Sequence, residues 1–147
     1  MVWNTEKKEI KILLVEDLEE HVLLIKNTLE HSGLKKSIWV CRDGEAALDY
    51  LYNRGDYASK EKYSKPDIIV LDLRLPKLDG LEVLKRIKSE ESLKDIPVVV
   101  LTASEETEDI RSVYNVEGTG YLLKSAFIVE KSKKMEGLLD AILSFGY

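Results

Sequence analysis

Short runs of apolar, mostly β-branched residues recur along the chain and predict strands. Two of them, Ile68–Leu71 and Val98–Leu101, consist of apolar residues alone. Such uninterrupted runs are typical of strands in a parallel sheet, which are buried on both faces. Five strands are predicted in this way, at Ile10–Val15, Ser37–Cys41, Asp67–Leu71, Pro97–Leu101 and Gly120–Leu123.

Between and after these runs, apolar residues recur at intervals of three and four, which is the spacing of one helical face. Gly33 stands where a glycine would end the first helix. Asp43 and Gly44 open the second helix, and Asp79 is a typical N-cap for the third. The five predicted apolar faces are Leu18, Val22, Ile25 and Leu29; Ala47, Leu48 and Leu51; Val83, Leu84 and Ile87; Ile110, Val113 and Tyr114; and Met135, Leu138, Leu139, Ile142 and Phe145.

The strand–helix alternation repeats five times in units of roughly 30 residues, the size of a βαβ unit. Because such crossovers are right-handed, the pattern predicts an α/β fold with a doubly wound parallel sheet and helices on both faces. A chain of 147 residues is a natural size for one domain, and no repeat or proline-rich linker divides it. We therefore expect a single domain over residues 1–147, with a polar loop at Arg54–Lys65.

Composition narrows the class of function. The formal net charge is −5 and no basic stripe is present, which argues against nucleic-acid binding. The single cysteine, Cys41, ends an apolar strand and is expected to be a small buried residue. Met1–Glu9 has no apolar signal-peptide core, and no window resembles a membrane span. These features favour a soluble, cytoplasmic protein without a membrane partner.

Polar residues of distinct chemistry follow four of the predicted strands. Glu16 and Asp17 follow the first strand, Asp72 the third, Thr102 the fourth and Lys124 the fifth. In doubly wound sheets ligands bind outside the carboxyl ends of the strands, so these side chains are expected to converge. Three carboxylates in one crevice repel each other and favour a hard divalent cation such as Mg²⁺.

The same set suits phosphoryl transfer, which needs positioning and charge neutralisation around a nucleophile. A metal ion would bring the oxygens of a phosphoryl donor next to the Asp72 carboxylate. Lys124 adds a cation on the opposite side, and the Thr102 hydroxyl can donate a hydrogen bond to a phosphoryl oxygen. By contrast, His21 and His31 complete no zinc site and are expected to be surface residues, with His21 near the acids.

These motifs resemble the receiver domain of two-component response regulators over nearly the whole chain. The segments that carry the resemblance are Ile12–Asp17, Asp67–Gly80, Val98–Ala103 and Gly120–Lys124. The resemblance implies a five-stranded flavodoxin-like sheet of order 2-1-3-4-5. More narrowly, the long loop before the third strand and the Lys124–Ser125 pair are similar to small stand-alone regulators that partner bacterial phytochromes.

The resemblance also implies roles for single residues. Asp72 would accept phosphate from a sensor histidine kinase, and Thr102 and Lys124 would contact the phosphoryl group. Mg²⁺ would be held by Glu16, Asp17, Asp72 and the backbone carbonyl of Arg74. Tyr121 would turn inward when Thr102 shifts, as the switch. The protein would then be a signalling protein and no enzyme beyond its own phosphorylation and dephosphorylation.

Three positions depart from the family pattern. Glu16 stands where many receivers have aspartate, and it is one methylene longer. Ser125 follows Lys124 where proline is usual; a cis bond without proline costs about 2.5–4 kcal/mol, so cis and trans both stay open. Arg74 is bulky and cationic beside the acceptor, and we expect it to alter access of the hydrolytic water. The long segment Ala126–Lys134 precedes the last predicted helix.

Other functions with the same fold fit less well. An aspartyl-phosphate hydrolase would show a second acid two residues after the nucleophile, where this chain has Arg74. A nucleotide or flavin binder would show a glycine-rich loop after the first strand, where acids stand instead. A receiver-like interaction module that works without phosphorylation remains an alternative. In the favoured function the signal leaves by contact, through a face at roughly Glu105–Tyr147 made by the fourth helix, fifth strand and fifth helix. That face is also a candidate homodimer surface, and the downstream protein is unknown.

Overall fold

The computed structural model describes residues 9–30, 36–102 and 119–123, and of Thr28, Thr102 and residues 119–123 it describes the main chain only. Within them the elements alternate as the sequence predicts. They are β1 (Ile10–Val15), α1 (Glu19–Glu30), β2 (Lys36–Cys41), α2 (Gly44–Tyr52), the 3₁₀ helix η1 (Gly55–Tyr57), β3 (Ile68–Leu71), α3 (Gly80–Ser89), β4 (Val98–Thr102) and β5 (Thr119–Leu123).

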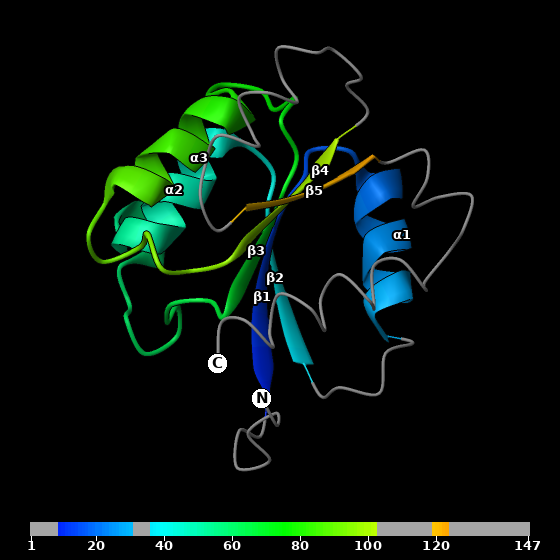
Figure 1. Ribbon diagram of the computed structural model, residues 1–147. Coiled ribbons are helices and arrows are strands. Elements are labelled where there is room, and N and C mark those ends of the chain that lie inside the picture. The colour runs from blue at the N-terminus through cyan, green and yellow to red at the C-terminus, as the bar shows by residue number, and fades with distance from the viewer. Residues whose placement is uncertain (1–8, 31–35, 103–118, 124–147) are drawn as a thin grey trace, which may run out of the picture.

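All five strands are parallel and their order is β2-β1-β3-β4-β5. Helix α1 covers one face of the sheet, and α2 and α3 cover the other (Figure 1). The predicted α/β fold, its strand order and its placement of helices on both faces are thereby confirmed. The predicted fourth and fifth helices, Gly33 and the segment Ala126–Lys134 lie outside the described residues.

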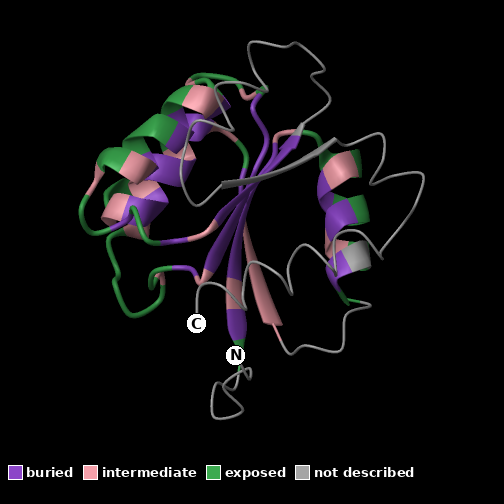
Figure 2. Cartoon of the chain, viewed as in Figure 1, coloured by how far each residue is buried: buried purple, intermediate pink, exposed green. Residues whose placement is uncertain are grey.

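The strands contribute to two hydrophobic cores, one on each face of the sheet, because successive side chains of a strand point to opposite faces. Leu13 and Ile69 belong to the core under α2 and α3, whereas Leu14 and Val70 belong to the core under α1. The central strands are buried along their length, while β2 is only half-buried as the edge strand (Figure 2). Two buried faces explain why β3 and β4 read as uninterrupted apolar runs.

One predicted core position is wrong. Leu18 was expected on the apolar face of the first helix, but its side chain is 50% exposed. It precedes α1, and its carbonyl accepts the first helical hydrogen bond, from the Val22 amide at 3.0 Å. Because Leu18 stands before the first helical turn, the spacing that buries Val22, Ile25 and Leu29 does not apply to it.

The loop at Arg54–Lys65 is more ordered than its polar composition suggests. It contains η1, and the rings of Tyr57 and Tyr63 meet edge-on with centroids 5.0 Å apart. Tyr63 also meets the ring of Trp39 on β2 edge-on, at 5.5 Å. The loop therefore lies against the edge of the sheet. No helix among the described residues is long and apolar enough to cross a membrane.

Candidate functional site

Strand register brings the acids to one edge of the sheet. Val15 on β1 is paired with Leu71 on β3, so Glu16 and Asp72 are the next residues of adjacent strands. The ladder continues one residue beyond the strands, since the Asp72 amide donates to the Val15 carbonyl at 3.0 Å. The Glu16 amide likewise donates to the carbonyl of Cys41 on β2, at 3.0 Å. Hydrogen bonds on both sides thus fix the backbone that carries the two carboxylates.

Glu16, Asp17 and Asp72 form one carboxylate cluster. Each offers an oxygen, and these oxygens lie within 4.8 Å of one another. Glu16 is 1% exposed and Asp72 is 4% exposed, whereas Asp17 is partly exposed. Burying like charges together is costly unless a cation or hydrogen bonds compensate. An all-oxygen set of this kind fits a hard divalent ion such as Mg²⁺, Mn²⁺ or Ca²⁺.

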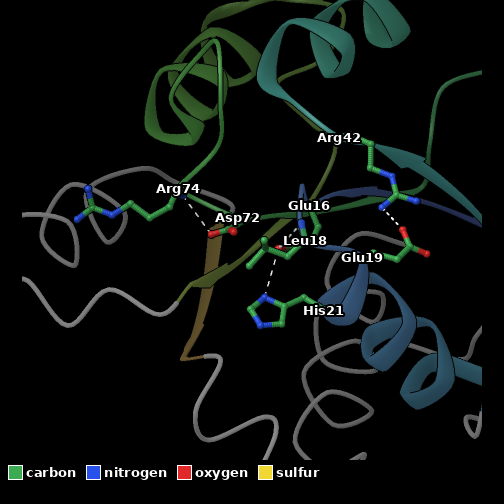
Figure 3. A network of polar contacts seen from close by, with 7 residues as sticks. All are labelled: Glu16, Leu18, Glu19, His21, Arg42, Asp72 and Arg74. Atoms are coloured by element: carbon green, nitrogen blue, oxygen red, sulfur yellow. Dashed lines mark hydrogen bonds and ion pairs between the residues drawn. The ribbon is translucent and has the colours of Figure 1, made fainter.

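Specific donors hold the buried carboxylates in place (Figure 3). Oε1 of Glu16 accepts from the Leu18 amide at 3.3 Å and lies 3.3 Å from Nδ1 of His21. Oδ1 of Asp72 accepts from the Arg74 amide at 3.1 Å. The side chain of Arg74 is exposed and extends away from Asp72 (Figure 3).

The turn between β3 and α3 is closely packed beneath Asp72. The Gly80 amide donates to the Leu73 carbonyl at 3.0 Å. Asp79 caps α3, as predicted, because its Oδ1 accepts from the Leu81 amide at 2.9 Å. Lys77 has a φ of +66°, and the Leu78 amide donates across it to the carbonyl of residue 76 at 2.8 Å. This three-residue γ-turn sets the path of the turn that starts at Asp72.

Charged pairs surround the acids on the neighbouring loops. Arg42, directly after β2, pairs with Glu19 at the start of α1 (Figure 3). Asp43 accepts from the Ala46 amide at 2.8 Å as the N-cap of α2. Its other oxygen lies 3.6 Å from Nζ of Lys77. These contacts connect the start of α1, the start of α2 and the turn after β3.

The other predicted site residues fall on the same edge or beyond the described residues. Leu71, Val100 and Tyr121 form one row across β3, β4 and β5. Thr102 ends β4 two residues after Val100, on the edge that carries Asp72. Tyr121 lies in the middle of β5, level with Leu71, the residue before Asp72. Lys124 follows the last residue of β5 and, with Ser125 and the bond between them, lies outside the described residues.

One contact was not anticipated from the sequence. His21 was expected at the surface near the acids, and it is indeed 27% exposed, but its Nδ1 reaches the buried carboxylate of Glu16. The available signal was its position: His21 is the third residue of α1, five residues after Glu16. In the first turn of the helix after β1, it lies over the end of the strand.

A family model, the response regulator receiver domain, matches residues 12–136. The chain belongs to the response regulator receiver domain family. It is a two-component signalling protein, as the sequence resemblance implied.

Individual relatives span nearly the whole chain. Response regulator Rcp1 of Synechocystis is 40% identical over 127 residues, 86% of this chain and 84% of its own length. The probable methanogenesis regulatory protein FilR2 of Methanothrix harundinacea is 44% identical over 130 residues, 88% of this chain and 81% of its own. The likeness to stand-alone phytochrome-associated regulators is thereby confirmed for Rcp1 and for RcpA.

Two solved structures share the fold closely. The phosphorylated cyanobacterial phytochrome response regulator RcpA superposes with a TM-score of 0.83 at 41% identity, covering 93% of this chain and 96% of its own. The Mn²⁺-bound form of Rcp1 superposes with a TM-score of 0.79 at 40% identity, covering 88% of this chain and 91% of its own.

Proposed function

We propose that Asp72 accepts a phosphoryl group from a phosphohistidine of a sensor histidine kinase. The observation that carries this proposal is the cluster of Glu16, Asp17 and Asp72, whose oxygens lie within 4.8 Å of one another. Support comes from the family and from the similar RcpA, whose structure is that of a phosphorylated protein. Residues 1–147 would form this one domain, acting in the cytoplasm.

In the proposed transfer an oxygen of the Asp72 carboxylate attacks phosphorus as the phosphorus–nitrogen bond of the donor breaks. The electron pair of that bond returns to the histidine nitrogen of the kinase. Asp72 is 4% exposed, and its Oδ1 is oriented by the Arg74 amide. Thr102, at the end of β4, would donate a hydrogen bond to a phosphoryl oxygen, and Lys124 would add a positive charge.

Mg²⁺ is the proposed cofactor, held by the carboxylates of Glu16, Asp17 and Asp72 and by the Arg74 carbonyl. Its chemistry there is to offset the negative charge of the phosphoryl oxygens. The Mn²⁺-bound structure of the similar Rcp1 supports a divalent ion. The burial of Glu16 and Asp72 supports it too, because a cation offsets the cost of two neighbouring buried carboxylates.

The phosphoryl group would act as a signal and not as a step in turnover of an external substrate. We propose that Thr102 and Tyr121 form the switch and that the face of helix 4, β5 and helix 5 meets the downstream protein or a second copy. Phosphorylation would shift the balance between two existing states of that face. A phytochrome-like kinase is the proposed donor, because RcpA and AtBRR, at 41% and 40% identity, are phytochrome response regulators.

The test is incubation with Mg²⁺ and a small phosphodonor, followed by intact-mass measurement. The wild type should gain one phosphoryl group that mild hydroxylamine removes, and Asp72→Asn should gain none. Asp79→Asn is the matched control: this nearby acid is a helix cap, asparagine caps equally well, and the adduct should persist. An adduct on Asp72→Asn would overturn the assignment of the acceptor. Steady release of phosphate from small phosphomonoesters would favour a hydrolase instead.

A further inference from the structure

We propose that His21 is a positioning residue that holds the Glu16 carboxylate in its orientation toward the metal. The inference rests on the proposed metal site and adds a residue to it. Nδ1 of His21 lies 3.3 Å from Oε1 of Glu16 (Figure 3). The Leu18 amide reaches the same oxygen at 3.3 Å. Two groups from the start of α1 therefore fix one oxygen of a side chain that is only 1% exposed.

Glutamate at this position creates the need for such support. The side chain has one more rotatable bond than aspartate, and fixing that bond costs conformational entropy. An isolated glutamate would lose this freedom only when the ion binds, and the affinity would fall accordingly. Contacts from His21 and Leu18 restrict the carboxylate beforehand. Both groups contact Oε1, and the carboxylate has a second oxygen, with two lone pairs of its own, through which it can bind a metal ion.

The geometry gives His21 the role of support and not that of a ligand. Among residues 9–30, 36–102 and 119–123, the group of converging ligand atoms is Glu16, Asp17 and Asp72, and His21 is not a member. The imidazole is 27% exposed and stands on α1 outside the cluster. Residues that hydrogen-bond a metal-binding carboxylate commonly change metal affinity about 10–100-fold when removed. His21 is placed to have such an effect.

The test measures binding of Mn²⁺ directly, from the electron paramagnetic resonance signal of the free ion, without any phosphodonor. His21→Ala should weaken binding about ten-fold. His21→Asn should restore most of the affinity, because its amide nitrogen occupies the place of Nδ1. His21→Gln places its amide where Nε2 stands and should not restore it. Leu23→Ala, which truncates another exposed side chain of α1, is the control and should bind as the wild type does.

A double variant isolates the contact with Glu16. In a Glu16→Asp background the carboxylate is shorter by about 1.5 Å, one carbon–carbon bond, and no longer reaches His21. His21→Ala should then cause no further loss of affinity, so the two substitutions are coupled. Full Mn²⁺ affinity in His21→Ala, or an equal loss in both backgrounds, would overturn this inference alone. Failure of the wild type to bind Mn²⁺ would overturn the proposed metal site and this inference with it.

Discussion

Gly80 lies against the main chain of Asp72. A Cβ added at Gly80 would come within 2.1 Å of the Asp72 carbonyl oxygen and within 2.6 Å of Cα of Leu73. Both atoms belong to the backbone, which cannot move aside as a flexible side chain can. The start of α3 is thus pressed against the residue proposed to accept the phosphoryl group, and the absence of a side chain at Gly80 permits that contact.

We predict that Gly80→Ala lowers the free energy of unfolding by about 3 kcal/mol, the upper part of the range for overpacking. It should also slow phosphorylation, because relief of the clash displaces the turn after β3. Urea unfolding and intact-mass measurement would check both effects. Gly55→Ala is the matched control: a Cβ there meets nothing within 4 Å, and only its φ of +56° opposes alanine. It should cost about 1 kcal/mol and leave phosphorylation unchanged.

Substitution of Arg74 tests the expectation that its side chain alters access of the hydrolytic water and thereby the lifetime of the phosphoryl group. The amide of Arg74 fixes Asp72, while its exposed side chain begins two residues from Asp72 and extends away from it. Arg74→Asn keeps the amide but removes the bulk and the charge. We expect faster loss of the phosphoryl group, because water reaches it more freely, with little change in stability. The decay of the phosphorylated mass after donor removal measures this, and an unchanged decay rate would contradict it.

The loop before β3 depends on Asn53. This residue ends α2 in the left-handed conformation, with φ 54° and ψ 53°. Its Nδ2 donates to the carbonyls of Tyr57 at 3.1 Å and Tyr63 at 2.9 Å. Asn53→Gly keeps the conformation but loses both hydrogen bonds, at about 1 kcal/mol each. Asn53→Ala adds about 1 kcal/mol of left-handed strain, so it should be the less stable variant in urea unfolding. Equal stability of the two would show that the backbone is not strained.

The sheet could be predicted from sequence because its signal is local. Uninterrupted apolar runs marked β3 and β4. Because the strands are parallel, their carboxyl ends, and with them Glu16 and Asp72, come to one edge of the sheet. The exposure of the Leu18 side chain could not be predicted, since the helical spacing is the same whether the helix begins at Leu18 or one residue later. The structural order of the polar loop could not be predicted either, because it comes from contacts such as that of Tyr63 with Trp39 on β2, which is distant in sequence.

The contact of His21 with Glu16 was hidden for a related reason. Periodicity says which side of a helix faces the sheet, but it does not say how far α1 begins above the end of β1. That offset decides whether the third residue of the helix reaches the acid or solvent. The metal and phosphoryl roles of the site residues came from chemistry and resemblance, and they remain predictions for the experiments above.

The buried thiol of Cys41 should make the free energy of unfolding depend on pH in the alkaline range. The thiol is 2% exposed, and burial raises its pKa from 9.0 to about 11. The hydroxyl of Tyr57, 3.9 Å from Sγ, lowers the pKa in part, while Asp43 and Asp49 raise it. Between these two pH values the unfolded chain loses the thiol proton and the folded protein retains it. Stability therefore falls as pH rises, by about 2 kcal/mol from this group.

Removal of the thiol separates this contribution from the others. Cys41→Ala should show a smaller decline in the free energy of unfolding between pH 9 and pH 11 than the wild type. Tyr57, whose pKa is raised to about 12 by burial and, to a lesser degree, by Cys41, adds a decline of its own above pH 10, which should be smaller in the variant. Urea unfolding at half-unit steps of pH measures the difference. Parallel curves for the two proteins would mean that the thiol ionises as readily in the folded state as in the unfolded chain.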